Sequence, residues 1–224
     1  MAYTGLRAAE VSGLEVGDLV FAPGPRCAAN VRRTKDRKNG AWVVGTLKSK
    51  KSRRIVPLPP WLARKLADYL GTDHPRANEP TAPLWPSRNN GGGYRAKGER
   101  YAVPLDWTQP LAMGTFYDTI LKPALEAVGL PASRRASKDA PAVHGVRLHD
   151  LRHTFAVLQL SAGTHFMQVS KWLGHSTFTL TLDVYGDYIP ERDGGAVNNL
   201  PEPTAPVTSA EAGGKVVPLG PQSG

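Results

Sequence analysis

The last 39 residues of the chain differ in composition from everything before them. Residues 186–224 contain seven Gly and six Pro and show no sustained apolar periodicity. Such a segment cannot bury enough apolar surface to offset the entropy that is lost on ordering. We therefore expect residues 1–190 to fold as one domain and residues 191–224 to form a disordered Gly- and Pro-rich tail.

Length and composition exclude several protein classes. With 224 residues and 41% hydrophobic side chains, the chain can build the core of one or at most two domains. No apolar run reaches the roughly 18 residues that a membrane helix needs, and we expect neither a secretory signal nor a membrane partner. Cys27 is the only cysteine, which excludes a disulfide framework and a cysteine-based zinc site and fits a reducing cytoplasm.

Apolar periodicity predicts an α+β chain that is mainly α. The helices are expected over residues 6–14, 61–70, 114–128, 149–161, 165–173 and 177–185. Two strands, 41–47 and 54–58, are expected to pair as a small β-hairpin across the turn that joins them. Residues 71–113, rich in Gly, Pro and Asn, are expected to be irregular.

Charge points to a polyanionic partner. The chain carries 28 basic and 19 acidic side chains, for a net charge of +9, and the tail from Gly186 onward is acidic. Ten of the basic side chains fall between Arg32 and Arg54, where Asp36 is the only acidic residue. So dense a surplus is typical of a surface that binds nucleic acid. A solvated basic face is the alternative.

Three familiar catalytic or metal sites fail on inspection. Gly93 and Gly98 have the spacing of a P-loop, but Glu99 and Arg100 follow where Lys and Ser or Thr are needed. There is no G-x-S-x-G elbow, so a serine hydrolase lacks its main support. His149 and His153 have the spacing of a helical zinc site, but Arg152 would repel the metal, and no metal is expected.

On the helix 149–161, a titratable and a charged side chain project together. His149 and Arg152 are three residues apart and therefore share a face. The buried stripe of this helix is expected to consist of Leu148, Leu151, Phe155 and Leu158. A guanidinium with a neighbouring imidazole is suited to hold a phosphate, although such a pair on a helix surface is often incidental.

Five short motifs follow one another in a recognisable order. They are Thr4-Gly5-Leu6-Arg7-x2-Glu10, Lys48 before Ile55-Val56-Pro57-Leu58, His149-Asp150-Leu151-Arg152-His153-Thr154, Leu173-Gly174-His175-Ser176 and Thr181-Leu182-x2-Tyr185. Together they resemble the signature of the tyrosine recombinases, the phage-integrase family. The resemblance spans about residues 3–188 and implies the fold of that family's catalytic domain.

The resemblance also implies a role for each matched residue. Arg7 and Arg152 would clamp the scissile DNA phosphate, and His175 would hold it by hydrogen bonding. Tyr185 would attack phosphorus to give a 3′-phosphotyrosine, with His149 as general base and Lys48 protonating the leaving 5′-oxygen. DNA-binding residues are expected in the basic segment: Arg32, Arg33, Lys50, Lys51, Arg53 and Arg54. Because fixed cations stabilise the transferring phosphoryl group, no metal and no cofactor are expected.

Two assignments have rivals within the sequence. Lys50 and Lys51 lie on the same predicted turn as Lys48, and Tyr188 is three residues from Tyr185. The position of Lys48 six residues before Arg54 and the Thr-Leu-x2-Tyr context favour the assigned residues. His175 and Tyr185 are also ten residues apart, or ~15 Å along one straight helix. A turn must therefore separate them if both serve one phosphate.

The chain departs from the family pattern at its start. Members usually carry a helical DNA-binding domain and at least one helix ahead of the Thr-Gly-Leu-Arg segment, so we expect an amino-terminally truncated domain with Arg7 on a frayed end. Two hypotheses result: a site-specific recombinase or integrase of a mobile element, or a catalytically silent remnant that binds DNA. The resemblance implies double-stranded DNA as partner, a homo-tetramer on it in the full-length form, and a cytoplasmic, nucleoid-associated location.

Overall fold

A three-stranded antiparallel sheet lies near the amino terminus of the computed structural model, which describes residues 1–24, 26–46, 53–88, 104–138 and 140–189. Its strands are β1 (Leu19–Ala22), β2 (Arg26–Val31) and β5 (Arg54–Leu58), in the order β1-β2-β5. Alternate residues of β5 are buried, as expected for a sheet with one covered face. That face packs with α2 (Pro60–Thr72) and α1 (Ala8–Gly13) into the first of two apolar clusters.

The predicted hairpin between residues 41–47 and 54–58 is wrong. Both strands exist, but β4 (Ala41–Thr46) pairs with β3 (Arg33–Lys38), whereas β5 pairs with β2. The reason is the Asn39-Gly40 turn, where both residues have positive φ, 50° and 80°. Such a two-residue turn matches the twist of the strands that it joins. The tight turn therefore commits β4 to β3 and leaves β5 free to join β2.

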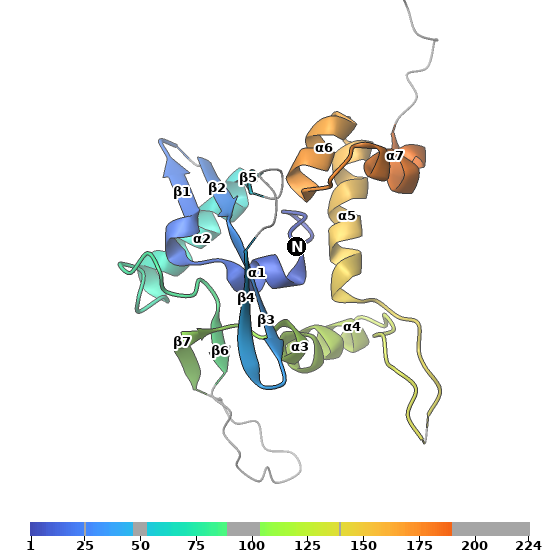
Figure 1. Ribbon diagram of the computed structural model, residues 1–224, viewed down its shortest axis with the longest axis horizontal. Helices are drawn as coiled ribbons and strands as arrows, with labels where there is room; N and C mark the ends of the chain where they lie inside the picture. The colour runs from blue at the N-terminus through green and yellow to red at the C-terminus, as the bar shows by residue number, and fades with distance from the viewer. Residues whose placement is uncertain (25, 47–52, 89–103, 139, 190–224) are drawn as a thin grey trace, which may run out of the picture. The chain divides into compact units, whose positions relative to one another are not determined.

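The helices agree closely with the sequence-based expectations, and the α+β class is confirmed. A continuous helical run from Met113 to Ala127 comprises α3 (Met113–Phe116), a π-helical turn and α4 (Lys122–Ala127). The last three helices are α5 (Leu148–Ser161), α6 (Phe166–Leu173) and α7 (Thr179–Tyr185). They share the second apolar cluster, and Figure 1 shows α6 and α7 beside the carboxyl-terminal half of α5.

The buried face of α5 differs from the predicted stripe. The structure buries Arg152, Phe155, Ala156 and Leu160. Of the predicted stripe, only Phe155 is buried, and Leu158 is 51% exposed. The face is rotated because Arg152 turns inward, where main-chain carbonyl groups bind its guanidinium. A charged side chain that the sequence pattern places outside is thus part of the interior.

The segment predicted to be irregular contains one more pair of strands. β6 (Pro86–Arg88) and β7 (Leu105–Pro110) are antiparallel. Leu84, just before β6, is fully buried in the first apolar cluster, and Tyr69 donates a hydrogen bond to its carbonyl. None of the helices in the described residues has the length and apolar character required to cross a bilayer.

Candidate active site

Three arginines from distant parts of the chain meet at the carboxyl end of α6. Arg54 Nε donates to the Trp172 carbonyl (2.6 Å), Arg152 Nη2 to that of Leu173 (2.7 Å) and Arg7 Nη2 to that of Gly174 (3.3 Å). The last carbonyl groups of a helix lack partners within the helix and carry partial negative charge. The end of α6 therefore gathers Arg7, Arg54 and Arg152, which we call the arginine cluster.

Two glycines make this convergence possible. Gly174 ends α6 with φ of 68°, and a Cβ placed there would lie 2.8 Å from Nη1 of Arg54. Gly5 has φ of 62°, and a Cβ there would collide with the ring of Phe155. The Gly5 carbonyl accepts a hydrogen bond from Arg152 Nη1 at 2.5 Å. The Thr-Gly-Leu-Arg and Leu-Gly-His segments thus need glycine both for a left-handed backbone and for close packing.

The carboxylate of Glu10 anchors the arginine cluster from the other side. It accepts hydrogen bonds from Arg54 Nη1 and Nη2 (2.9 and 2.8 Å) and from Arg7 Nη1 (3.0 Å). Burial alone would raise the pKa of Glu10, but the hydrogen bonds and charge of Arg54 outweigh it and lower this pKa below its usual value. Glu10 is therefore an ionised, fully engaged carboxylate.

Two predictions about these arginines need correction. Arg54 was expected to face DNA, but its side chain is only 2% exposed because it pairs with buried Glu10. Arg7 was expected on a frayed end, but Glu10 and the Gly174 carbonyl hold its guanidinium, while Arg152 holds the adjacent Gly5. Both side chains are therefore fixed parts of the site, and 42% of the Arg7 side chain faces solvent.

The arginine cluster brings three guanidinium groups close together. Among the described residues, the carboxylate of Glu10 pairs with two of them, those of Arg7 and Arg54. Burial, followed by the charges of Arg7 and Arg54, lowers the pKa of Arg152 to about 10. Repulsion among these fixed cations is relieved by an anionic ligand, so the arrangement favours binding of a phosphate.

The hydroxyl of Tyr185 points into the same region from α7. This helix reverses the usual pattern, since it buries Thr181 and Tyr185 and exposes Leu180 and Val184. The Tyr185 side chain packs against the second apolar cluster, and the residue is 5% exposed. Burial raises the pKa of Tyr185, and the nearby charge of Arg152 partly opposes this rise. At neutral pH the phenol is therefore protonated.

His153 contacts this hydroxyl, although its spacing from His149 in the sequence suggested only a metal site. His153 Nδ1 lies 2.5 Å from Tyr185 Oη, and its ring is 4.8 Å from that of His149, between centroids. The sequence does show that His149, Arg152 and His153 occupy adjoining positions on one helix. The contact between His153 and Tyr185 depends on where α7 packs, and the helical period of α5 does not determine this.

His175 lies between the arginine cluster and α7. A left-handed Gly174 and a turn separate α6 from α7, as the predicted joint action of His175 and Tyr185 requires. The His175 Nδ1 and Thr181 Oγ1 atoms are 2.9 Å apart and share a hydrogen bond. Burial and then the charges of Arg152 and Arg7 lower the pKa of His175 to about 4, so its ring is neutral at physiological pH.

His149 belongs to the same neighbourhood but is more open to solvent than Arg152. Burial, followed by the proximity of His153 and Arg152, lowers its pKa. The structure therefore brings together five of the six predicted catalytic residues: Arg7, His149, Arg152, His175 and Tyr185. The sixth, Lys48, lies outside the described residues, as do Lys50 and Lys51.

The remaining predicted DNA-binding residues lie in two places. Arg32 pairs with Asp18 (2.8 Å), and Arg33 pairs with both Asp18 and Glu15 (2.6 and 2.9 Å). Arg53 is exposed and lines a groove of about 950 Å³ that it shares with His175. Arg53 is thus a predicted DNA-binding residue in the described part of the chain that is exposed and borders the candidate site.

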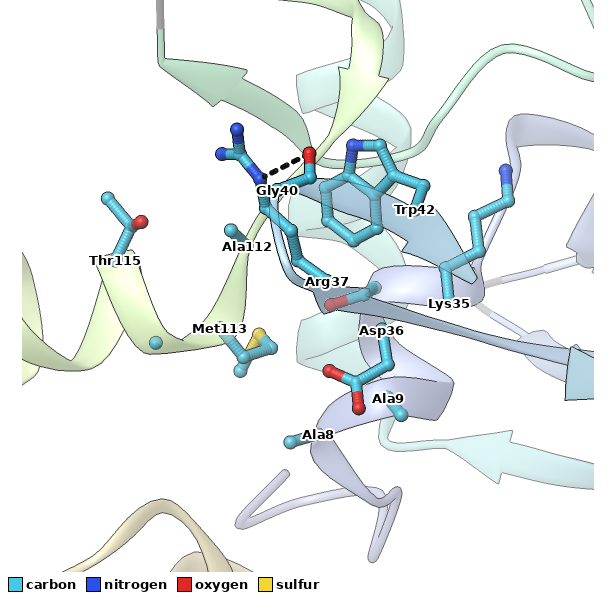
Figure 2. Close-up of a pocket in the computed structure, with 12 residues that line it drawn as sticks. Ala8, Ala9, Lys35, Asp36, Arg37, Gly40, Trp42, Ala112, Met113 and Thr115 are labelled. Atoms are coloured by element: carbon cyan, nitrogen blue, oxygen red, sulfur yellow. Dashed lines mark hydrogen bonds between the residues drawn. The ribbon is translucent and has the colours of Figure 1, made fainter. Parts of the chain in front are cut away.

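A separate cavity lies beside the hairpin β3–β4 and contains none of the predicted catalytic residues. It measures about 460 Å³ and is lined by Lys35, Asp36 and Trp42 of the hairpin, with Met113 of α3 (Figure 2). Arg37 Nε donates to the Gly40 carbonyl across the turn (3.4 Å). Among the described residues, no group of three or more His, Cys, Asp or Glu side chains could hold a metal ion.

Comparison with known proteins agrees with this geometry. No protein-family model matches the chain. It is similar to a XerC-like tyrosine recombinase of Caldanaerobacter subterraneus, with 25% identity over 203 residues that cover 88% of the chain and 46% of the relative. It also resembles the ICEBs1 integrase of Bacillus subtilis, with 36% identity over 47 residues, or 21% of the chain and 13% of that protein. The chain therefore spans less than half the length of either curated relative.

Solved structures show the same fold. The Tn1549 transposon integrase in complex with circular intermediate DNA superposes with a TM-score of 0.54 and 19% identity, over 82% of this chain and 52% of that one. A variant of the same integrase bound to transposon right-end DNA gives a TM-score of 0.52 over the same share of this chain. The chain is therefore related to the tyrosine recombinases and has the fold of their catalytic domain.

Proposed function

We propose that residues 1–190 form the catalytic domain of a site-specific recombinase that cuts and rejoins double-stranded DNA through a 3′-phosphotyrosine. One observation carries the proposal: Arg7, Arg152, His175 and Tyr185 come from four separate segments and meet at one site. Arg7 and Arg152 both donate to carbonyl groups at the end of α6, and the charges of both lower the pKa of His175. A buried phenol beside the fixed positive charge of Arg152 is suited to attack a phosphodiester. Neither a metal nor a cofactor has a part in this reaction.

Each residue has a distinct part in the proposed reaction. Arg7 and Arg152 donate to the non-bridging oxygens of the scissile phosphate, where negative charge accumulates in the transition state. The hydroxyl of Thr181 donates to Nδ1 of His175, which leaves an Nε2–H group to donate to the same phosphate. Tyr185 Oη attacks phosphorus, and the bond to the 5′-oxygen breaks. Because the phosphotyrosine retains the energy of the broken bond, rejoining needs no ATP.

Two predicted residues have weaker support. Lys48 is proposed to protonate the leaving 5′-oxygen, which rests on the family resemblance alone because Lys48 lies outside the described residues. His149 is kept within the phosphate-binding group on the strength of its proximity to Arg152. Its predicted role as general base is reconsidered below, because the imidazole that shares a hydrogen bond with the Tyr185 hydroxyl is that of His153.

The proposed partner is duplex DNA. The Tn1549 integrase, which shares the fold, has been solved with DNA, and this chain places exposed cations such as Arg53 beside the site. Arg32, Arg53, Lys50 and Lys51 would contact the DNA backbone. We further propose that the full-length protein acts as four protomers on two duplexes at the nucleoid.

The test is to trap the covalent intermediate. The full-length gene product is incubated with nicked duplexes that tile the DNA flanking its gene, because the nick lets the cleaved fragment diffuse away and blocks rejoining. We expect a protein–DNA adduct that survives denaturation and disappears in Tyr185→Phe, while Tyr188→Phe still forms it. DNA binding without any adduct would instead support the catalytically silent remnant.

A further inference from the structure

His153 is placed to act on the atom that the proposed reaction uses. It lies one turn after His149 on α5, and its Nδ1 faces Tyr185 Oη at 2.5 Å. The two rings are 5.7 Å apart between centroids and tilted by 53°, which excludes simple stacking as the basis of their contact. A phenol and an imidazole nitrogen at this distance share a hydrogen bond.

We propose that His153 is the general base of the reaction and accepts the phenolic proton of Tyr185 at Nδ1 as Oη attacks phosphorus. This inference rests on the proposed function and replaces His149 in the role predicted from the sequence. A base must lie within hydrogen-bond reach of the proton that it removes. Among the described residues, the imidazole of His153 is the basic group that the structure hydrogen-bonds to Tyr185.

The other candidate bases are engaged elsewhere. Both oxygens of Glu10 bind guanidinium groups, so this carboxylate is stabilised in its ionised form and is a weak base. His175 bonds Thr181 through Nδ1, and the neighbouring arginines disfavour its protonation. His149 packs edge to face against the ring of His153, one helical turn earlier on α5. Position and availability therefore both favour His153.

The proton and the electron pairs balance in each half of the reaction. As Oη attacks, its proton moves to Nδ1 of His153, which becomes an imidazolium with Nε2 already protonated. The P–O5′ bond breaks, and the 5′-oxygen keeps the electron pair and gains a proton from the general acid. In the reverse step, a 5′-hydroxyl attacks phosphorus and gives its proton back to the group that acted as general acid. The Tyr185 oxygen leaves with its electron pair, and the imidazolium returns its proton to it.

Charged and titratable groups surround the contact between His153 and Tyr185. Among the described residues, His149 and Asp150 on α5 and Tyr185 on α7 lie near His153. The charge of Arg152 favours loss of the phenolic proton of Tyr185. Arg152 therefore assists the transfer of this proton to the neighbouring imidazole.

The decisive experiment compares single-turnover adduct formation by wild type, His153→Asn and His149→Asn on the nicked duplex that traps the wild-type protein. The Asn amide can occupy the position of Nδ1 and keep a hydrogen bond, but it cannot take up a proton. We expect a loss of about 100-fold or more in His153→Asn. His144→Asn, an exposed histidine outside the site, serves as the control and should retain the wild-type rate.

The pH profile separates a base from a structural contact. Because a base takes the phenolic proton in the wild type, its rate should become independent of pH well below the range in which the phenol itself titrates. In His153→Asn it should instead climb about tenfold per pH unit toward the titration of the phenol itself, since only the phenolate can attack. Replacing Tyr185 by a fluorinated tyrosine, whose phenol is more acidic, should restore the rate of His153→Asn more than that of wild type.

A DNA-free measurement keeps the two proposals distinguishable. Nitrogen-15 NMR of the protein alone should show His153 as the Nε2–H tautomer, with an Nδ1 shift that changes in Tyr185→Phe. A His153→Asn or His153→Gln protein that forms adduct at the wild-type rate and pH profile would overturn the general-base assignment and leave the recombinase proposal intact. If the wild-type protein forms no adduct, both the recombinase proposal and the general-base assignment fail, even if NMR detects the hydrogen bond between His153 and Tyr185.

Discussion

Two groups of basic side chains in this protein have different partners in the structure. The arginine cluster consists of Arg7, Arg54 and Arg152, whose guanidinium groups bind the carbonyl end of α6. The hairpin cations, which are Arg32, Arg33 and Lys35, pair with Asp18 and Glu15 in the segment before β1. The arginine cluster joins four segments of the chain, whereas the hairpin cations join the start of the hairpin β3–β4 to the segment before β1.

The comparison shows that local charge density is a poor guide to a phosphate site. The hairpin cations belong to the most basic segment of the chain, yet they form ion pairs with Asp18 and Glu15. In the arginine cluster, Arg7 and Arg152 are isolated residues in segments of ordinary composition, whereas Arg54 is the last residue of the basic segment. What distinguishes the three arginines is that backbone carbonyl groups, and not only a carboxylate, accept their hydrogen bonds. A carbonyl group holds a guanidinium in place without neutralising its charge.

The largest expected effect is loss of Arg152. Arg152→Ala should lower the rate of adduct formation about 1,000-fold, since removal of one fixed donor to a transition-state oxyanion costs about that much. It also leaves the buried Gly5 and Leu173 carbonyls without their partner, so the melting temperature should fall. Arg64→Ala, an exposed arginine on α2, is the control. Equal rates for the two variants would show that the arginine cluster does not bind the phosphate.

Loss of Glu10 should be the largest effect on stability alone. Glu10→Gln removes the carboxylate charge that pairs with buried Arg54, and the free energy of unfolding should fall by about 3–5 kcal/mol at neutral pH. Urea denaturation followed by circular dichroism measures this change. A fall no greater than that of an exposed ion pair, below about 1 kcal/mol, would mean that the arginine cluster is not held by Glu10.

The same variant makes a prediction about pH. The pKa of Glu10 is lower in the folded protein than its ordinary value of 4.5, so its ionised form contributes stability above that value. This contribution should be lost as the pH falls below about 4.5 and through the lowered pKa of the folded state. The stability difference between wild type and Glu10→Gln should therefore shrink on acidification, and a difference that grows would contradict the assignment.

Gly174 offers an intermediate test of the close packing at the cluster. Gly129 has a similar positive φ of 75°, with nothing within 4 Å of an added methyl group, so Gly129→Ala measures the backbone cost alone. That cost is about 1–2 kcal/mol. Gly174→Ala should cost a further 1 kcal/mol or so, because its methyl group presses on Arg54. Thermal unfolding measures the loss of stability in both variants. Equal losses would show that the added methyl group at residue 174 does not press on Arg54.

The smallest effect is expected in the hairpin cations. Arg32→Gln should change the free energy of unfolding by less than about 1 kcal/mol, because Arg33 still pairs with Asp18. If Arg32 contacts a DNA phosphate, the slope of log affinity against log salt for a random-sequence duplex should fall by about 1. Arg64→Gln should leave that slope unchanged. A slope unaffected by Arg32→Gln would remove this residue from the proposed interface.

Helices and motif order could be read from the sequence because they depend on local periodicity and spacing. The bounds of α5 and the turn after Leu173 were predicted within a few residues. The partner of β4 was missed because pairing depends on which turn closes, and the Asn39-Gly40 turn was overlooked. Arg54 and His153 were misjudged for another reason: their roles depend on Glu10 and Tyr185, which lie more than 30 residues away in the chain.

The most direct test of the central claim identifies the residue that carries DNA. The trapped adduct is digested with nuclease and protease, and tandem mass spectrometry locates the nucleotide remnant on the peptide that contains both Tyr185 and Tyr188. The arrangement of Arg152, His153 and Tyr185 predicts a 3′-phosphate ester on Tyr185. A remnant on Tyr188, or on any residue outside α7, would contradict the account.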